Sequence, residues 1–421
     1  MALPHADRIV AFDVIRVIAI TMILFSHMLS VGDSTLLETF KGLMGVTGNG
    51  LFFFMSGHLI YSNNNSFSTL SSVIRFYKRR AIRIYPLYWI ALLLFIVVST
   101  TLSMGDYTTQ TLFTYLVGAQ VVFMPRYIAD IPYYWFVSAI LLFYLIYPYI
   151  IQSDHSTKNY IWRSLIVLGL LFLIRVSTGL IEGRFFEYFP VFVLGILSSR
   201  EDFLSSATYH NIRKISPAML CFCIFIAGIT KPAMFDRLQA LSLELMLTAG
   251  LVVLLRIVII LSAMVVLYRL LSGRLYASFE IQVISSCAVA SYAVYLFHNS
   301  YYVLLDLWLS QHVYVGEYLK SAIFLSAGVL GLFVVAYSIQ KTMDEIQNSL
   351  FRKRIMETFR DTLRKHHPMS ESGEGHDRRR RGRGGIPSPV GLFTPAPGYS
   401  RRLQPGSGHG RYRRPPRQRG R

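Results

Sequence analysis

Long apolar runs recur from the N-terminus to about residue 340, and each approaches the roughly 20 residues that an α-helix needs to cross a bilayer. Three clear examples are Ile15–Val31, which only Arg16 and His27 interrupt, Leu87–Leu102 and Ile323–Tyr337. Soluble proteins rarely contain so many charge-poor runs of this length. The pattern therefore predicts an all-α, polytopic membrane helix bundle.

Eleven segments are candidate spans. They lie near residues 10–31, 44–62, 84–104, 110–124, 133–152, 162–181, 186–200, 213–231, 243–268, 285–308 and 318–340. Two of these segments are weaker than the rest: 110–124 is short and carries Gln110 and Gln120, and 186–200 is also short. The pattern predicts about ten transmembrane helices, either ten or eleven.

Charge placement predicts the orientation, because short cytoplasmic loops are enriched in Lys and Arg. The densest basic cluster before the C-terminal tail follows the second span and consists of Arg75, Lys78, Arg79, Arg80 and Arg83. This cluster places the N-terminus in the cytoplasm. The basic segment after Lys341 favours the same side for the C-terminus, so the number of crossings should be even. Ten crossings follow if 110–124 does not cross.

Composition agrees with this class. Of the 421 residues, 53% are hydrophobic and 15% are charged, against roughly 25% charged in an ordinary soluble domain. We predict a transmembrane domain over residues 1–345, a charged cytoplasmic helix at the inner membrane surface over 346–365, and a disordered tail over 366–421. The expected location is the cell membrane, with several passes and both termini in the cytoplasm.

The tail holds much of the net charge of +19. It contains 13 arginines and three acidic residues, and it is rich in Gly and Pro, so it cannot bury enough apolar surface to fold. A solvated tail without a partner is one interpretation. Attraction to anionic lipid, at roughly 1 kcal/mol per basic residue, is another, and nucleic acid is the least favoured partner.

Ionisable residues inside spans are costly and are functional candidates by default. Arg16 and His27 are eleven residues apart, which places them about 20° apart around a helix and about 16 Å apart along it. Asp13, three residues before Arg16, can pair with it. The spacing alone leaves two interpretations open: a functional helix face, or an ion pair at a helix end with a packed histidine.

A second candidate lies where the third span begins. Arg80 and Arg83, at positions i and i+3, share a helix face at the predicted cytosolic boundary, which suits phosphate oxygens. The segment Tyr85-Pro86-Leu87-Tyr88-Trp89 follows. A plain topology signal with an aromatic interface belt is the alternative interpretation.

Five motifs in order resemble those of the membrane acyltransferase family 3. They are Phe12-Asp13-Val14-Ile15-Arg16 running on to His27, Leu51–Ile60, Arg80-x-x-Arg83 with Tyr85–Trp89, Trp135–Ser138 with Tyr144 and Pro148, and Ser291–His298. The resemblance covers about residues 8–340.

The resemblance implies transfer of an acyl group, usually acetyl from acetyl-CoA, to a hydroxyl of a glycan, a lipid-linked sugar or another surface molecule. It implies that His27 is catalytic with Arg16 as its partner, and that Arg80 and Arg83 bind the donor's phosphates. Acyl-CoA would be a substrate, and no permanently bound cofactor is expected. Asp13, Ser56, His58, Trp135, Tyr292 and His298 are candidates for structural or cavity-lining roles.

Two positions depart from the family pattern: Ile140 stands where many relatives have Glu, and His58 replaces the usual Phe. We expect no metal site, because His27, His58 and His298 lie on different helices without ligand-type spacing. Arg256 is left open: it could contact substrate, pair with Glu244 or Glu280 across a kink, or mark a helix break.

A transporter of a sugar or small molecule is the rival function, because buried Arg and His can also line a transport path. Transporters often contain paired halves with broken spans, and the sequence contains no such pairing. The five motifs favour the enzyme.

Overall fold

In the computed structural model, every regular element in the part of the chain that it describes is a helix. These residues are 5–27, 35–104, 107–127, 133–152, 156–200, 210–211, 214–222, 243–271, 274, 276–312 and 316–366. Among them, five helices are long and apolar enough to cross a membrane. The chain is therefore an all-α, multi-pass membrane protein, whereas the count of about ten crossings stays a prediction.

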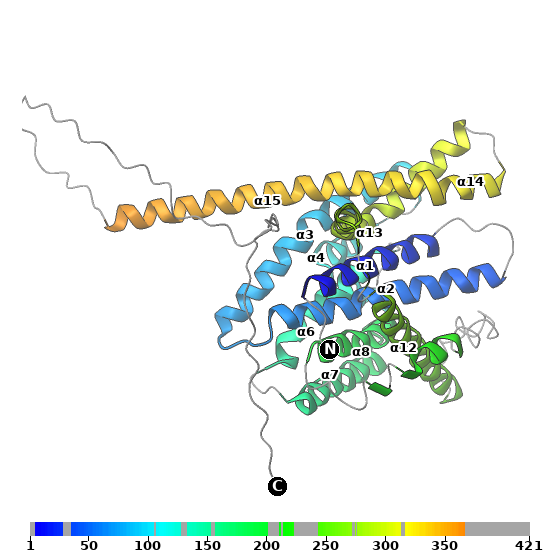
Figure 1. The fold of residues 1–421 in the computed structure, drawn as a ribbon, viewed down its shortest axis with the longest axis horizontal. Helices are drawn as coiled ribbons and strands as arrows, with labels where there is room; N and C mark the ends of the chain where they lie inside the picture. The colour runs from blue at the N-terminus through cyan, green and yellow to red at the C-terminus, as the bar shows by residue number, and fades with distance from the viewer. Residues whose placement is uncertain are drawn as a thin grey trace, which may run out of the picture. The chain divides into compact units, whose positions relative to one another are not determined.

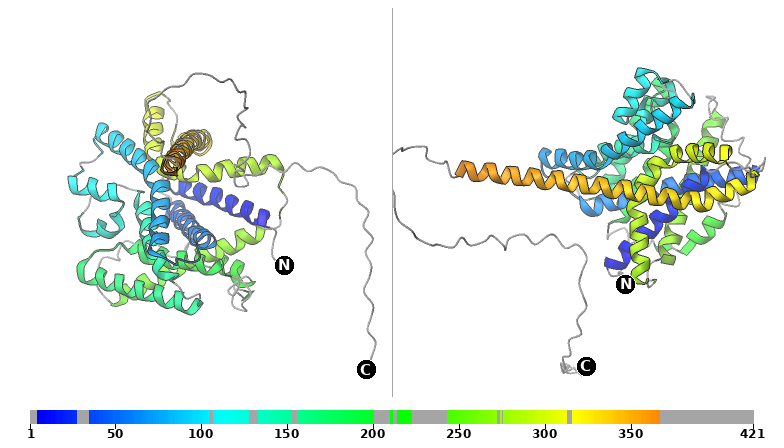
Figure 2. Two further views of the ribbon diagram at one scale, coloured as in Figure 1. Left: turned by 90° about the vertical axis from the view of Figure 1, so that its left-hand side faces the viewer. Right: turned by 90° about the horizontal axis from the view of Figure 1, so that it is seen from above.

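The centre of the bundle is built around the first helix (Figures 1 and 2). Helix α1 (His5–Ser26) packs against α2 (Thr35–Asn63) and α13 (Ser278–His312). On its other side, α2 packs against α8 (Gly183–Ser198) and α12 (Leu243–Leu271). These contacts fix α1 between helices from both halves of the chain.

Glycines allow the backbones in this core to approach closely. A Cβ atom added to Gly57 of α2 would lie 2.0 Å from the carbonyl oxygen of Phe192 on α8. A Cβ atom added to Gly195 of α8 would lie 2.1 Å from the carbonyl oxygen of Phe54 on α2. Small residues drive close helix packing in membranes because lipid gives helices no hydrophobic reason to associate. The glycine of the Ser56-Gly57 motif thus serves packing between α2 and α8.

The doubtful span 110–124 is a helical hairpin. Helix α4 (Thr109–Val117) ends at Gly118, whose φ of +72° is a left-handed conformation suited to glycine, and α5 (Gln120–Tyr127) follows. With nine and eight residues, each is far shorter than a membrane-spanning helix.

The hairpin lies along α3 (Leu70–Thr101). Just before α4, the Tyr107 hydroxyl lies 2.5 Å from the hydroxyl of Ser99 on α3. At the end of α4, the hydroxyl of Tyr85 on α3 donates to the Val117 carbonyl at 2.8 Å. The two α3 residues are about 21 Å apart along the helix. The chain then turns back, because the Gln120 amide donates to the carbonyl of Tyr134, just before α6. The departure of 110–124 from a continuous span is thus shown, whereas its path relative to the membrane stays a prediction.

Aromatic side chains of α3 cap the end of α4. Carbonyls at a helix C-terminus have no partner within the helix. Here the Tyr85 hydroxyl donates to the Val117 carbonyl and the Tyr88 hydroxyl to the Tyr115 carbonyl. The indole N–H of Trp89 donates to the Leu116 carbonyl. The aromatic motif after Arg83 therefore holds the end of α4 against α3, in addition to any role at the membrane interface.

The remaining described helices complete the bundle. They are α6 (Trp135–Ile150), α7 (Thr157–Thr178), α14 (Glu317–Ile323), a π-helical turn η1 (Phe324–Gly328) and α15 (Val329–His366). Residues 346–365 belong to α15, which begins at Val329 and continues through them without a break. A separate helix at the inner membrane surface stays a prediction. Of the candidate span 213–231, only 214–222 is described. The tail beyond residue 366 lies outside the described residues.

The chain divides into two units, Met1–Glu357 and Thr358–Arg421. All the sites discussed below belong to the first unit.

Arg256 has a partner that the sequence did not indicate. Helix α12 continues through this position without the suggested break. The Arg256 guanidinium lies 2.7 Å from a carboxylate oxygen of Glu187 on α8, and the Glu187 side chain is only 5% exposed. An ion pair inside a bundle joins helices at the cost of burying both charges, so Arg256 contributes to the contact between α8 and α12.

The glycine contact predicts a stability difference between two positions on α2. Gly57→Ala should destabilise the protein by about 1–3 kcal/mol, the usual effect of overpacking, because its new methyl group meets the α8 backbone. Gly42→Ala is the matched control, since a Cβ there meets nothing within 4 Å. Thermal unfolding of purified protein in detergent measures both. Equal melting of the two variants would show that α2 and α8 do not pack as described.

Candidate functional site

The first polar cluster lies at the C-terminal end of α1. His27 follows the last helical residue, Ser26. Its ring packs edge-on against Tyr133, with centroids 4.2 Å apart, and stacks on His298 of α13, with centroids 5.1 Å apart and planes 28° apart. The structure thus brings together two histidines that are 271 residues apart in the sequence.

The protonation pattern of His298 follows from its contacts. Its Nδ1 lies 2.6 Å from the carbonyl oxygen of Tyr295. A carbonyl only accepts, so Nδ1 carries the hydrogen, and Nε2 of the neutral ring has a free lone pair. This Nε2 is buried and has no hydrogen-bond partner among the described residues. A buried acceptor without a partner is expensive in a structural role, which favours a function for His298.

Tyr133 is held in a strained conformation beside the two histidines. Its φ is +82°, in the left-handed region that non-glycine residues rarely adopt. The Tyr295 hydroxyl donates to the Tyr133 carbonyl, and the neighbouring Tyr134 hydroxyl donates to the carbonyls of Ala91 and Leu296. These bonds tie the segment to α3 and α13. Backbone strain of this kind is concentrated at functional sites.

The last family motif explains how α13 positions this cluster. Tyr292, Tyr295 and His298 are spaced three residues apart, so they fall along one side of the helix. The Tyr292 hydroxyl donates to the Ile84 carbonyl on α3 at 3.0 Å. Together the three side chains connect α13 to α3, to the segment before α6, and to His27.

A charged pair completes this end. Lys41 of α2 is only 5% exposed, lies 3.1 Å from Glu38, and acts electrostatically on His27. Lys41 was not selected from the sequence, because it lies outside the family motifs.

The second cluster lies about halfway along α1, at Arg16. The Arg16 guanidinium is 2.8 Å from the Asp13 carboxylate, so this predicted pair is present. Arg83 of α3 and Tyr144 of α6 both lie within electrostatic range of Arg16. The Arg80 guanidinium lies over the Tyr144 ring, 5.2 Å from its centroid.

Arg16 and Arg80 therefore both lie near Tyr144, and Arg83 lies within electrostatic range of Arg16. Among the groups just named, Asp13 supplies the one carboxylate. Arg83 is exposed and Arg80 is half-buried, so both can reach a ligand. Such a cluster suits a ligand with several phosphates. Since α1 separates Arg16 from His27 by about 16 Å, Arg16 belongs to this cluster and does not touch His27.

The other predicted residues lie apart from His27. His58 is buried, pairs with the Ser198 hydroxyl at 2.9 Å and packs against Phe12, so it joins α2 to α8 and α1. Trp135 lies under the Arg184 guanidinium, 4.4 Å from its centroid, and stacks on Tyr188. Ser56 is half-buried on α2. No group of three or more possible metal ligands occurs among the described residues.

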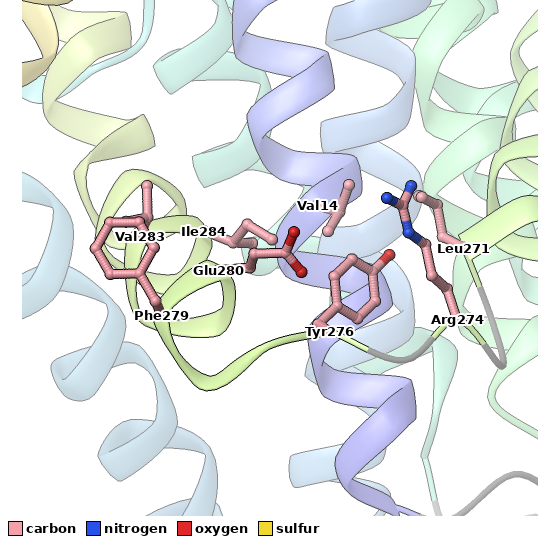
Figure 3. Close-up of a pocket in the computed structure, with 8 residues that line it drawn as sticks. All are labelled: Val14, Leu271, Arg274, Tyr276, Phe279, Glu280, Val283 and Ile284. Carbon is pink, nitrogen blue, oxygen red and sulfur yellow. The ribbon is translucent and has the colours of Figure 1, made fainter.

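Two cavities lie along the first part of α13. The first, of about 350 Å³, is mostly apolar and lies between Val14 of α1, Leu271 at the end of α12 and the start of α13, with Arg274 and Glu280 at its edge (Figure 3). The second, the α13–α15 cleft, has a volume of about 250 Å³. It is lined by Ser285, Ser286 and Val289 of α13 and by Tyr337, Lys341, Asp344, Glu345 and Asn348 of α15.

The fold and these clusters define a helical membrane protein with a histidine site at the C-terminal end of α1 and an arginine site beside the middle of the same helix. Comparison with protein families then identifies its class. The model of an acyltransferase domain matches residues 9–341, so the chain belongs to the acyltransferase 3 family of membrane-bound O-acyltransferases. It is therefore an enzyme that transfers acyl groups. No curated protein and no solved structure matches the chain.

Proposed function

We propose that this enzyme moves an acetyl group from cytoplasmic acetyl-CoA to a hydroxyl of a glycan or lipid-linked sugar on the far side of the membrane. The observation that carries the proposal is the separation of the two clusters along α1, with Arg16 at the middle of the helix and His27 at its C-terminal end. The arginine cluster would lie at the cytoplasmic surface with the donor, and His27 would lie towards the acceptor.

The arginine cluster supports a CoA donor. Arg80 and Arg83 share a helix face, and Arg16 stands close to them, so several phosphate oxygens could be paired at once. A neutral sugar would gain little from three guanidinium groups. This favours the enzyme over a transporter of neutral sugars.

The histidine pair supports the chemical step. In the proposed reaction, a ring nitrogen of neutral His27 takes the proton of the acceptor hydroxyl as its oxygen attacks the thioester carbonyl. The C–O bond forms, the C–S bond breaks, and the CoA thiolate leaves and is protonated. Transfer through an acetyl-histidine is the alternative route. His298 and Tyr133 would act as positioning residues that hold the His27 ring.

The geometry also sets a requirement for the donor. The phosphates and His27 would be about 16 Å apart along α1. Only the slim pantetheine arm of CoA needs to enter the bundle, while the charged nucleotide stays at the surface. This avoids the cost of moving phosphate charges into the membrane interior.

The first test concerns His27. His27→Ala should reduce acetyl transfer by at least about 10²-fold, the contribution typical of a general base, without reducing membrane insertion. His312→Ala, at an exposed histidine on α13, is the matched control and should transfer normally. The measurement is release of CoA by purified protein with a cell-surface glycan extract. Wild-type turnover of His27→Ala would remove His27 from the mechanism.

The second test concerns the donor site. Charge-assisted contacts contribute about 1.5–3 kcal/mol each, so Arg83→Ala should weaken CoA binding by roughly 10- to 150-fold. Arg83→Lys should restore only part of the affinity, because it keeps the charge and loses the planar geometry. Arg75→Ala, at another exposed arginine of α3, should bind normally.

Calorimetry in detergent compares these variants. Unchanged binding by Arg83→Ala would mean that the arginine pair serves topology alone. Failure of folded wild-type protein to bind CoA would favour the transporter.

A further inference from the structure

The two helices that form the α13–α15 cleft are each hydrogen-bonded to the arginine motif of α3. The Gln347 amide of α15 donates to the Ile82 carbonyl at 3.2 Å, and the Tyr292 hydroxyl of α13 donates to the Ile84 carbonyl at 3.0 Å. Both bonds end on residues adjacent to Arg83. Helices α13 and α15 thus meet α3 on either side of the arginine that is proposed to bind phosphate.

The cleft faces the same region. On α13, Ser285 and Val289 are seven and three residues before Tyr292, and this spacing places all three on one side of the helix. On α15, Tyr337, Lys341, Asp344 and Asn348 likewise share one side and lie next to Gln347. The cleft therefore lies on the side of α13 that carries Tyr292, whose hydroxyl bonds to the carbonyl of the residue after Arg83.

The 350 Å³ cavity does not lie on the side of the arginine cluster. Val14, which lines it, is two residues before Arg16, so the two side chains leave α1 about 160° apart. That cavity lies across α1 from the arginine cluster.

The chemistry of the cleft suits the end of a nucleotide. The carboxylates of Asp344 and Glu345 can accept hydrogen bonds from ribose hydroxyls or a base amine, but they would repel a chain of phosphates. The ring of Tyr337 offers a surface on which a base can stack, and the Lys341 ammonium can pair with an isolated phosphate. A volume of about 250 Å³ is smaller than the 300–1,000 Å³ of a pocket for a whole ligand of drug size. It would hold only part of a donor.

We infer that the α13–α15 cleft binds the adenosine 3′-phosphate end of the acyl-CoA donor. The inference rests on the proposed function. The arginine cluster holds the diphosphate, the cleft holds the base and ribose, and the arm continues towards His27. The last helix of the domain thereby becomes part of the donor site, which the family motifs did not indicate.

Two probes test the cleft in full-length protein in detergent. CoA carries the nucleotide. The second probe, 4′-phosphopantetheine, has the pantetheine arm and one phosphate but lacks the nucleotide. Ser285→Phe, which fills the cleft, and Asp344→Asn, which keeps its shape, should each weaken CoA binding by about fivefold or more. Binding of 4′-phosphopantetheine should not change. Ser338→Phe is the matched control, because Ser338 is exposed on α15 and does not line the cleft.

The outcomes separate this inference from the proposed function. CoA binding that survives in both cleft variants but is lost in Arg83→Ala would overturn the cleft assignment and leave the donor site at the arginines. Equal weakening of both probes by Asp344→Asn would also overturn it, since that change would not be specific to the nucleotide. Absence of CoA binding by folded wild-type protein would overturn the proposed function itself.

Discussion

The interior of a membrane offers no water to backbone N–H and C=O groups, so the chain can leave helical geometry there only where the protein supplies partners. This constraint explains the least regular part of the bundle. At the turn between α4 and α5, the side chains of Tyr85, Tyr88 and Trp89 donate hydrogen bonds to the carbonyls at the end of α4. The Ser138 hydroxyl accepts a hydrogen bond from the backbone N–H of Val121. Two hydrogen bonds hold the segment before α6. The Tyr134 hydroxyl donates to the Ala91 carbonyl, and the Tyr295 hydroxyl donates to the Tyr133 carbonyl.

The histidine site depends on the same bonds. Tyr133 reaches His27 because its backbone is held in a left-handed conformation by the Tyr295 hydroxyl, and His298 is oriented by the carbonyl of Tyr295. Residues that satisfy the backbone thus also position the side chains proposed to act in catalysis. Close packing at Gly57 and Gly195 gives the surrounding helices the rigidity that such positioning needs.

Features that depend on local periodicity could be predicted from the sequence. The helical class, the Asp13–Arg16 pair and the departure of 110–124 from an ordinary span follow from hydropathy and helical spacing, and the ordered motifs identified the family. Partners distant in the chain could not be predicted: nothing local indicates that Arg256 meets Glu187, that His298 stacks on His27, or that Tyr133 has a positive φ. The role of Tyr85, Tyr88 and Trp89 was also missed, because an aromatic cluster near a membrane boundary suggests an interface belt whether or not it caps a helix.

The central claim is that α1 connects a cytoplasmic donor site with a histidine site near the opposite surface, and sidedness tests it most directly. Ser66 in the loop before α3 and Met104 after it are both exposed, and each can be replaced by cysteine after Cys221, Cys223 and Cys287 are changed to alanine. A maleimide that cannot cross membranes should label Met104→Cys in intact cells, and should label Ser66→Cys only after permeabilisation. Labelling of Ser66→Cys in intact cells, with Met104→Cys protected, would place the arginine cluster outside the cytoplasm and contradict the account.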